Sequence, residues 1–191
     1  MTLPAKPQLT VSTPMRGTSS AVFKDAMVVR TEVFVHEQGI PIYREIDDDD
    51  ERSIHWVVYA DGQTPVGVIR LVPSPHVPLD LPEPHGDHPE GTFFKLGRTA
   101  VSKKYRGLGI ARILADVTTR YACDNPGEVG PRGKDGVALE GLGEWDGRCL
   151  VHAQSSVQGM WAKSGFVLDP AMGEWDEEGI MHVGMWRVLR A

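Results

Sequence analysis

The segment Tyr105-Arg106-Gly107-Leu108-Gly109-Ile110-Ala111 lies where a predicted strand, residues 93–101, gives way to a predicted helix. The apolar residues of that helix recur at the spacing of one helix face: Ile110, Leu114, Val117 and Tyr121. Two glycines at such a turn leave backbone N–H groups uncovered at a helix N-terminus, which favours an anion. Arg106 adds a fixed positive charge with a forked set of donors. The segment therefore predicts a diphosphate-binding loop.

Two better-known phosphate loops do not fit this segment. The P-loop ends in Gly-Lys-Ser or Gly-Lys-Thr, which is missing here. The dinucleotide fingerprint needs a third glycine, and Arg112 stands in its place. The remaining pattern, Arg-x-x-Gly-x-Ala over residues 106–111, resembles the coenzyme A diphosphate loop of the GNAT superfamily of N-acetyltransferases. The alternative is an ordinary glycine-rich turn.

Two later segments carry the same resemblance. Residues 154–166 read Gln-Ser-Ser-Val-Gln-Gly-Met-Trp-Ala-Lys-Ser-Gly-Phe. Ser155 or Ser156 is expected to cap a short helix there, and Gly165 to end it in the left-handed conformation. This segment looks like the late helix of the family. Gly179-Ile180-Met181-His182, before a closing strand, resembles the ElaA-like branch.

The first helix adds a fourth segment. Val33-Phe34-Val35-His36-Glu37-Gln38, with the acidic residues Glu45, Asp47 and Asp50 after it, resembles the same ElaA-like branch. The four segments follow the order of the family, so the resemblance covers about residues 9–189. It implies the GNAT fold, an α/β chain with a mixed, mostly antiparallel central sheet of six to seven strands flanked by helices. It also implies acetyl-CoA as co-substrate.

Hydrophobic patterning predicts the individual elements. A helix is expected over residues 21–35, with Ser19 or Ser20 as its cap, and the cofactor helix over 107–121. Asp61-Gly62 predicts a hairpin turn, and residues 73–91 a long loop. Strands are expected at 9–13, 54–60, 66–72, 93–101, 149–153, 166–168 and 181–189.

The composition bounds the class of protein. With 191 residues, 41% of them hydrophobic and 24% charged, we expect a single domain spanning 1–191 with a flexible N-terminus at 1–8. No apolar run could span a bilayer and the N-terminus lacks a signal pattern, so a cytoplasmic location without membrane contact is expected. The net charge of −6 argues against a nucleic-acid partner. A homodimer is possible.

Residues 124–148 are thick with glycine and charge and show no hydrophobic period. The resembled family makes this connection more briefly, so we interpret the stretch as an insertion. A loop this long is uncommon in a compact domain. Two interpretations stay open: a mobile surface loop, or a flap or interface element anchored by Trp145.

The resemblance assigns the cofactor contacts. The diphosphate loop is expected at Arg106, Gly107, Leu108, Gly109, Ile110 and Ala111. In the family, the strand before this loop pairs with the pantetheine arm and supplies a backbone N–H to the oxyanion. By position, that role falls to Thr99, Ala100 and Val101. Gln154, at the end of the following strand, is also expected near the cofactor.

Acetyl transfer to an amine requires the amine to be neutral. An alkyl ammonium has a pKa near ~10.4, so holding it neutral at pH 7 costs roughly 4–5 kcal/mol, and a general base is expected. His182, His36 and Glu37 are candidate bases; histidine titrates nearest neutrality, and His182 lies in an ElaA-like segment. Each has an alternative: His182 could be a hydrogen-bonded strand histidine, His36 could complement a helix dipole, and Glu37 could be a solvated helix end. The further candidates are Asp47, Asp50 and His55.

One position departs from the family. Many members carry a tyrosine on the late helix that protonates the leaving thiolate. Here the corresponding pair is Met160-Trp161. An indole N–H is a donor but not a usable acid, so Trp161 is expected at most to hydrogen-bond the sulfur. The departure puts the acid step in doubt and leaves the reaction itself possible, because a thiol of pKa near ~8.5 can leave as a thiolate.

Two acidic runs, residues 47–51 and 174–178, are the clue to the acceptor. In the resembled fold both border the mouth of the acceptor site, where they would attract cations. Gln38, Asp47 and Asp50 are therefore the expected substrate-binding residues. Alternatively, the runs are merely solvated. No metal site is expected, because the spacing of His76, His85 and His88 lacks ligand geometry.

These observations predict an acetyl-CoA-dependent N-acetyltransferase. The expected acceptor is the primary amine of a small cationic molecule, a basic amino acid or a polyamine. An amino-sugar or protein N-acetyltransferase is the alternative within the class. Outside it, the chain could be a non-catalytic CoA-binding sensor or a docking protein.

Overall fold

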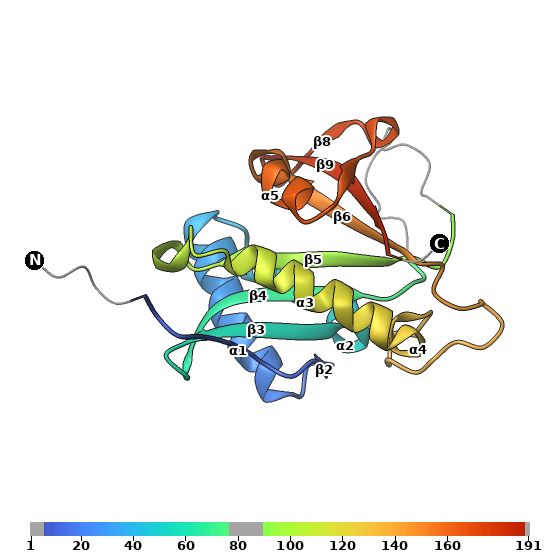
Figure 1. Cartoon of the computed structure of the whole chain (residues 1–191), viewed down its shortest axis with the longest axis horizontal. Helices are drawn as coiled ribbons and strands as arrows, with labels where there is room; N and C mark the ends of the chain where they lie inside the picture. The colour runs from blue at the N-terminus through green and yellow to red at the C-terminus, as the bar shows by residue number, and fades with distance from the viewer. Residues whose placement is uncertain (1–5, 77–89, 190–191) are drawn as a thin grey trace, which may run out of the picture.

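The computed structural model describes residues 6–76 and 90–189, and within them the chain is organised around one nine-stranded sheet (Figure 1). The strand order is β1-β3-β4-β5-β6-β9-β7, with β2 beside β3 and β8 beside β9. The pairs are antiparallel except β5–β6, which is parallel. The bounds are Leu9–Val11 (β1), Met15–Arg16 (β2), Ile54–Ala60 (β3), Thr64–Val72 (β4), Phe94–Val101 (β5), Arg148–Gln154 (β6), Val167–Leu168 (β7), Glu174–Glu177 (β8) and Ile180–Val188 (β9).

This topology confirms the mixed, mainly antiparallel class that the sequence predicts. Two short strands, β2 and β8, were not expected. The Asp61-Gly62 hairpin is confirmed, since both residues have positive φ, 50° and 83°, as a type I′ turn requires. Thirteen residues of the predicted loop 73–91, numbers 77–89, lie outside the described residues.

The helical segments are α1 (Ala21–Arg30), the π-helix η1 (Thr31–Glu37), η2 (Ile42–Arg44), α2 (Asp49–Arg52), η3 (Lys103–Tyr105), α3 (Ile110–Asp124), α4 (Pro126–Val129), η4 (Ser155–Val157), α5 (Gln158–Lys163) and η5 (Pro170–Met172). The Ser20 hydroxyl caps α1 by accepting from the Phe23 N–H at 3.0 Å. The predicted helix 21–35 therefore starts as expected but ends in a π-helix. In the described ranges, no helix is long and apolar enough to cross a membrane.

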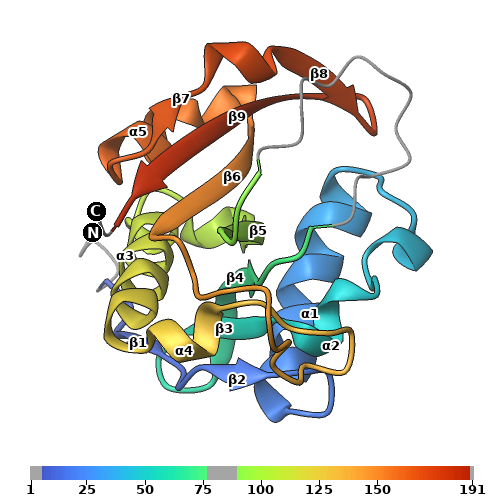
Figure 2. The same ribbon diagram turned by 90° about the vertical axis from the view of Figure 1, so that its right-hand side faces the viewer.

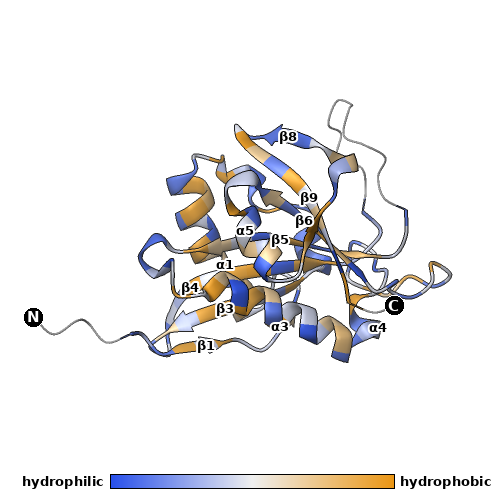
Figure 3. Ribbon diagram, turned by 45° about the horizontal axis from the view of Figure 1, so that its top comes forward, coloured by the Kyte–Doolittle hydropathy of each residue, from blue (hydrophilic) through white to orange (hydrophobic). Residues whose placement is uncertain are grey.

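Two helices cover the two faces of the sheet (Figure 2). On one face α1 packs Val22, Ala26 and Val29 against residues of β3 and β4. On the other face Ile110 and Leu114 of α3 pack against the larger part of the core. The colouring in Figure 3 shows the resulting pattern, because β3 and β4 are mostly hydrophobic whereas α3 alternates between hydrophilic and hydrophobic residues. Burial of the apolar side of α3 therefore holds this helix, which follows the glycine loop, in place against the sheet.

The late segment differs in detail from its prediction. Residues Ser155–Val157 form a 3₁₀ turn, and α5 begins at Gln158 without a side-chain cap, so the expected serine cap is wrong. Gly165 ends the helix with φ of +83°, as predicted, and the Phe166 N–H donates to the Trp161 carbonyl at 3.1 Å.

The stretch 124–148 holds more structure than its sequence suggests. It begins with α4 and contains an isolated bridge between Arg132 and Ala138. Trp145 is 7% exposed and its ring lies 5.4 Å from that of Phe94, so this end of the stretch is anchored in the core. The stretch follows the C-terminal end of α3, whereas the glycine loop lies at the other end of that helix (Figure 1).

Candidate active site

The sheet opens between its two parallel strands. β5 and β6 pair only through Phe94, Lys95 and Leu96 with Cys149, Leu150 and Val151. A bulge in the β4–β5 ladder, where Arg98 has φ of 48°, marks the point where β5 diverges. Beyond it Ala100 and Val101 pair with β4 alone. The backbone of β5 at Ala100 and Val101 therefore offers an unpaired edge to an extended ligand.

Two buried hydroxyl groups flank this opening. The Thr99 Oγ1 and Ser155 Oγ atoms are buried and have no hydrogen-bond partner among the described residues. Thr99 belongs to β5, and Ser155 directly follows the last residue of β6. An unsatisfied buried hydroxyl costs about 1–3 kcal/mol, so both are suited to a polar ligand. The amide-rich pantetheine arm of coenzyme A fits that requirement. No motif indicated Ser155 in this role.

The glycine loop lies at the end of β5. Gly107 and Gly109 have φ of +81° and +80°, and no atom lies within 4 Å of the position a Cβ would take on either one. Gly109 is the N-cap residue of α3. The loop therefore presents bare backbone at a helix N-terminus, as an anion site requires. Ile110 is buried in the core, so its contribution is limited to its backbone.

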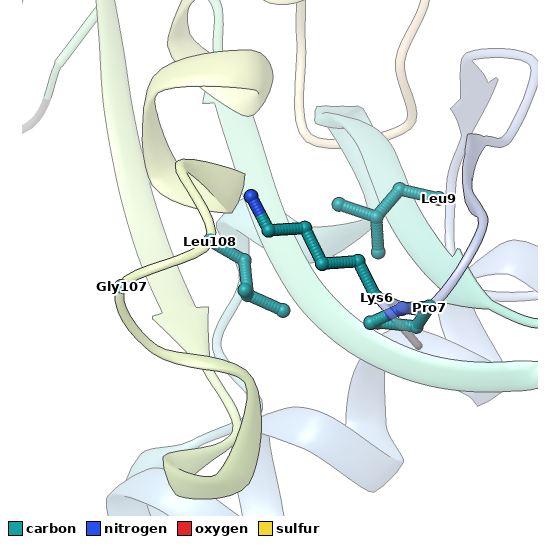
Figure 4. Close-up of a pocket in the computed structure, with 5 residues that line it drawn as sticks. All are labelled: Lys6, Pro7, Leu9, Gly107 and Leu108. Atoms are coloured by element: carbon teal, nitrogen blue, oxygen red, sulfur yellow. The ribbon is translucent and has the colours of Figure 1, made fainter. Parts of the chain in front are cut away.

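A cavity of about 160 Å³ adjoins the same loop (Figure 4). It is lined by Gly107 and Leu108 and by three residues of the N-terminal segment, Lys6, Pro7 and Leu9. The lining contains no residue of β6, so this cavity lies beside the loop and is separate from the opening between β5 and β6. We do not assign the donor site to it.

Arg106 is held by a partner that the sequence did not suggest. Its Nη1 and Nη2 atoms donate to Oε1 and Oε2 of Glu37, both at 2.7 Å, and its Nε donates to the Val101 carbonyl at 3.1 Å. The hydrogen bond from Arg106 lowers the pKa of Glu37. Glu37 is thus a poor general base, which corrects its expected role. The outward N–H groups of Arg106 stay available to a phosphate.

Asp47 and Asp50 lie in a charge-balanced network rather than at an open anionic mouth. Glu45, Asp47 and Asp50 meet three arginines through ion pairs of 2.6 to 3.7 Å: Arg30, Arg70 and Arg98. Burial would raise the pKa of Asp47 and Asp50, but the arginines, Arg70 above all, outweigh it and lower both pKa values. These carboxylates are already neutralised, which corrects the expectation that they attract a cationic acceptor.

The three histidines considered as general bases lie in different parts of the structure. His55 is fully buried, its Nε2 lies 3.0 Å from the Asp50 carbonyl oxygen, and burial lowers its pKa to about 4. It lies on β3, which β4 separates from the opening between β5 and β6. His36 is exposed on η1. His182 lies on β9 opposite Gln154 of β6.

His182 is oriented by its surroundings. Its Nδ1 lies 2.8 Å from the Ile180 carbonyl oxygen, so Nδ1 carries the hydrogen in the neutral ring and Nε2 keeps a lone pair. Its ring stacks on Trp175 of the unexpected strand β8, with centroids 6.2 Å apart. Gln154 donates through Nε2 to Oε1 of Gln38 at 3.2 Å. The structure therefore brings together Gln38, Gln154 and His182, which come from separate parts of the sequence.

Trp161 is a core residue. It is 2% exposed and packs edge to face against Phe166 at 5.1 Å. Its expected contact with the leaving sulfur is therefore not supported. Within the described residues no set of three or more His, Cys, Asp or Glu side chains is placed to hold a metal ion. His85 and His88 lie outside the described ranges.

Comparison with known proteins identifies the family. Residues 22–127 match the acetyltransferase (GNAT) family, and the chain belongs to it. It is 30% identical over 166 residues to the UPF0039 protein Rv2851c of Mycobacterium tuberculosis, covering 85% of this chain and 82% of that one. It is 37% identical over 101 residues to the uncharacterized N-acetyltransferase YjcF of Bacillus subtilis, covering 53% of this chain but only 60% of that protein.

The solved structure of Escherichia coli ElaA has the same fold, with a TM-score of 0.64, 21% identity, and coverage of 94% of this chain and 99% of that chain. The protein is thus an acyltransferase of the GNAT family, for which the donor is a CoA-linked acyl group.

Proposed function

We propose that this acyltransferase uses acetyl-CoA to acetylate the primary amine of a small cationic acceptor. The observation that supports the proposal most is the opening between β5 and β6, flanked by two partnerless hydroxyls and ending at the Gly107–Gly109 loop. Bound acetyl-CoA supplies the acetyl group as an activated thioester. The backbone N–H groups of Gly107 and Gly109 would hold the diphosphate, and those of β5 would stabilise the oxyanion.

The amine would be deprotonated on the other side of the opening. The lone pair on His182 Nε2 is the acceptor for its proton, and the hydrogen bond from Nδ1 keeps the ring in that tautomer. The amide groups of Gln38 and Gln154 lie beside it and would orient the amine. No described tyrosine takes the expected place on α5, so the thiolate would leave unprotonated.

Glu177 is the acidic residue that best supports a cationic acceptor. Trp175 pairs with His182 and Glu177 with Ile180, so both side chains share the face of the sheet that carries His182. Glu174 and Asp176 alternate onto the opposite face. Glu178 forms an ion pair with Arg44 at 2.6 Å. An amino-sugar or protein amine remains the alternative acceptor.

The diphosphate loop is tested by Gly109→Val. A branched side chain is strained at φ of +80° and its Cβ would project into the open space of the loop. We expect the Kd for CoA, measured by calorimetry, to rise about ten- to a hundredfold, as for loss of a hydrogen bond to a charged group. Gly127→Val is the control, because Gly127 also faces open space but has no positive φ. Normal CoA binding by Gly109→Val would remove the loop from the site.

Acceptor charge is tested by Glu177→Gln. We expect the KM for cationic amines to rise about two- to fivefold at low salt, as for one exposed charge pair, and the difference to shrink as salt screens it. The KM for acetyl-CoA should not change. Glu174→Gln, on the opposite face, removes the same charge and should have little effect. Equal effects of the two variants, or a preference for neutral amines in an amine panel assayed by thiol release, would contradict a cationic acceptor.

A further inference from the structure

Lys95 is a cation in an unusual position. It lies in the middle of the sheet, on β5, between the buried strand residues Val72 and Leu150. Its side chain is partly buried, and no hydrogen bond or ion pair joins it to another residue in the described ranges. Lysines are seldom buried without a partner. Such a residue is suited to an anion that the protein itself does not supply.

The strand register places Lys95 on the same face as the candidate base. Lys95 pairs with Leu150 of β6, and His152 and Gln154 follow Leu150 on that face. Gln154 in turn pairs with His182. These residues form a row along one face of the sheet, with Lys95 and Leu150 at one end and Gln154 and His182 at the other. Leu150 and Gln154 are four residues apart, so roughly 13 Å of strand separates the two ends of this row. The length of the lysine side chain shortens the gap between its amine and the imidazole.

The charges around Lys95 come from several neighbouring elements. Asp49 and Arg52 of α2 and Glu177 of β8 act on it, and in Figure 2 β5 lies between α2 and β8. His76 is also near, since Lys95 contributes to the lowered pKa of that histidine. Asp49 is already bonded to Arg52 at 2.6 Å. Burial is the largest influence and lowers the pKa of Lys95 to about 8. At neutral pH the amine is therefore still mostly charged.

We propose that Lys95 binds the carboxylate of the acceptor, so that the acceptor is an amino acid acetylated on an amine remote from its carboxylate. The inference rests on the proposed function, because it places the reacting amine at His182. The separation along the sheet is too long for an α-amine and its own carboxylate. In a diamino acid, the side-chain amine can approach His182 while the carboxylate approaches Lys95. The net positive charge of such an acceptor is compatible with the nearby carboxylate of Glu177.

The experiment compares substrates that differ only by the carboxylate, using the full-length protein: ornithine with putrescine, and lysine with cadaverine. Lys95→Met removes the charge and keeps the length of the side chain. We expect it to raise the KM for ornithine and lysine about ten- to a hundredfold, and to leave the KM for the diamines and for acetyl-CoA unchanged. Lys95→Arg should recover part of the loss. Lys24→Met, at an exposed lysine of α1, is the control.

The pH dependence gives a second measurement. Carboxylate binding needs the charged amine, so the KM of the wild-type protein for the amino acids should rise as pH increases past about 8, the pKa of Lys95. The KM for the diamines should lack this Lys95-dependent rise, and Lys95→Met should abolish it. Equal use of amino acid and diamine by the wild type, or equal changes for both in Lys95→Met, would overturn the inference. Failure to acetylate any amine would instead reject the proposed function, on which this inference depends.

Discussion

Replacing His182 with glutamine should lower kcat/KM for alkyl amines by about 10²- to 10⁴-fold, the usual contribution of a general base. Glutamine keeps a polar side chain on β9 but has no lone pair basic enough to take the proton. In the neutral ring, the hydrogen bond from Nδ1 to the Ile180 carbonyl leaves the lone pair on Nε2. Calorimetry with CoA should give an unchanged Kd, because the donor loop is formed by other residues.

Two comparisons make this result specific. The loss should shrink for an amine whose pKa lies below 7, since such an amine is already neutral and needs no base. His36→Gln should have little effect, because His36 is exposed on η1. If His36→Gln reduces turnover and His182→Gln does not, the base is His36 and the proposed role of His182 is wrong.

Arg70→Met should destabilise the fold by about 3–5 kcal/mol, the range found when one partner of a buried ion pair is removed. Arg70 donates through Nη1 to Asp47 at 2.6 Å and to Asp50 at 2.7 Å. Without it, buried carboxylates keep their charge with too little compensation. Urea unfolding measures the difference. Arg112→Met, which breaks an exposed pair with Asp116 at 3.6 Å, should cost no more than about 1 kcal/mol.

The sign of the pH dependence follows from the same residues. Burial raises the pKa of Asp47 and Asp50, and the arginines, Arg70 first, more than reverse it. In the wild type these lowered pKa values contribute stability above the pKa of the unfolded chain, and this is lost as pH falls through the folded value. In Arg70→Met the strongest influence that lowers the pKa values of Asp47 and Asp50 is gone, so burial raises them relative to the wild type. The difference in unfolding free energy between the two proteins should therefore narrow in acid, and a constant difference would contradict this account.

Much of the fold could be predicted from the sequence, because these strands and turns are determined by residues close together in the chain. The strand Ile54–Ala60 has the predicted bounds, and the hairpin after it is set by Asp61 and Gly62. β8 was missed because Glu-Trp-Asp-Glu has little strand character of its own. It becomes a strand by pairing with β9 along four residues, which is a long-range effect that patterning does not detect.

The site was predicted unevenly for a similar reason. Motifs indicated the glycine loop and, separately, Gln38, Gln154 and His182, whose grouping is visible only in the structure. The neutralisation of Asp47 and Asp50 depends on Arg30, Arg70 and Arg98, which are far apart in the sequence. One signal was present: Arg30 lies four residues after the buried Ala26, and Arg70 lies within the apolar strand 66–72. A charged residue on a buried face requires a partner of opposite charge.

The π-helical turn η1 determines where two neighbouring side chains point. Glu37 bonds to Arg106 beside the glycine loop, and the next residue, Gln38, bonds to Gln154 across the opening. An α-helix advances by about 100° per residue, from its 3.6 residues per turn, and a wider turn alters this angular phase for every residue that follows. Deleting one residue from η1 would restore α-helical phase and rotate both side chains away by about 100°. The additional backbone of this turn therefore sets the rotation that lets consecutive residues reach the glycine loop and the end of β6 at once.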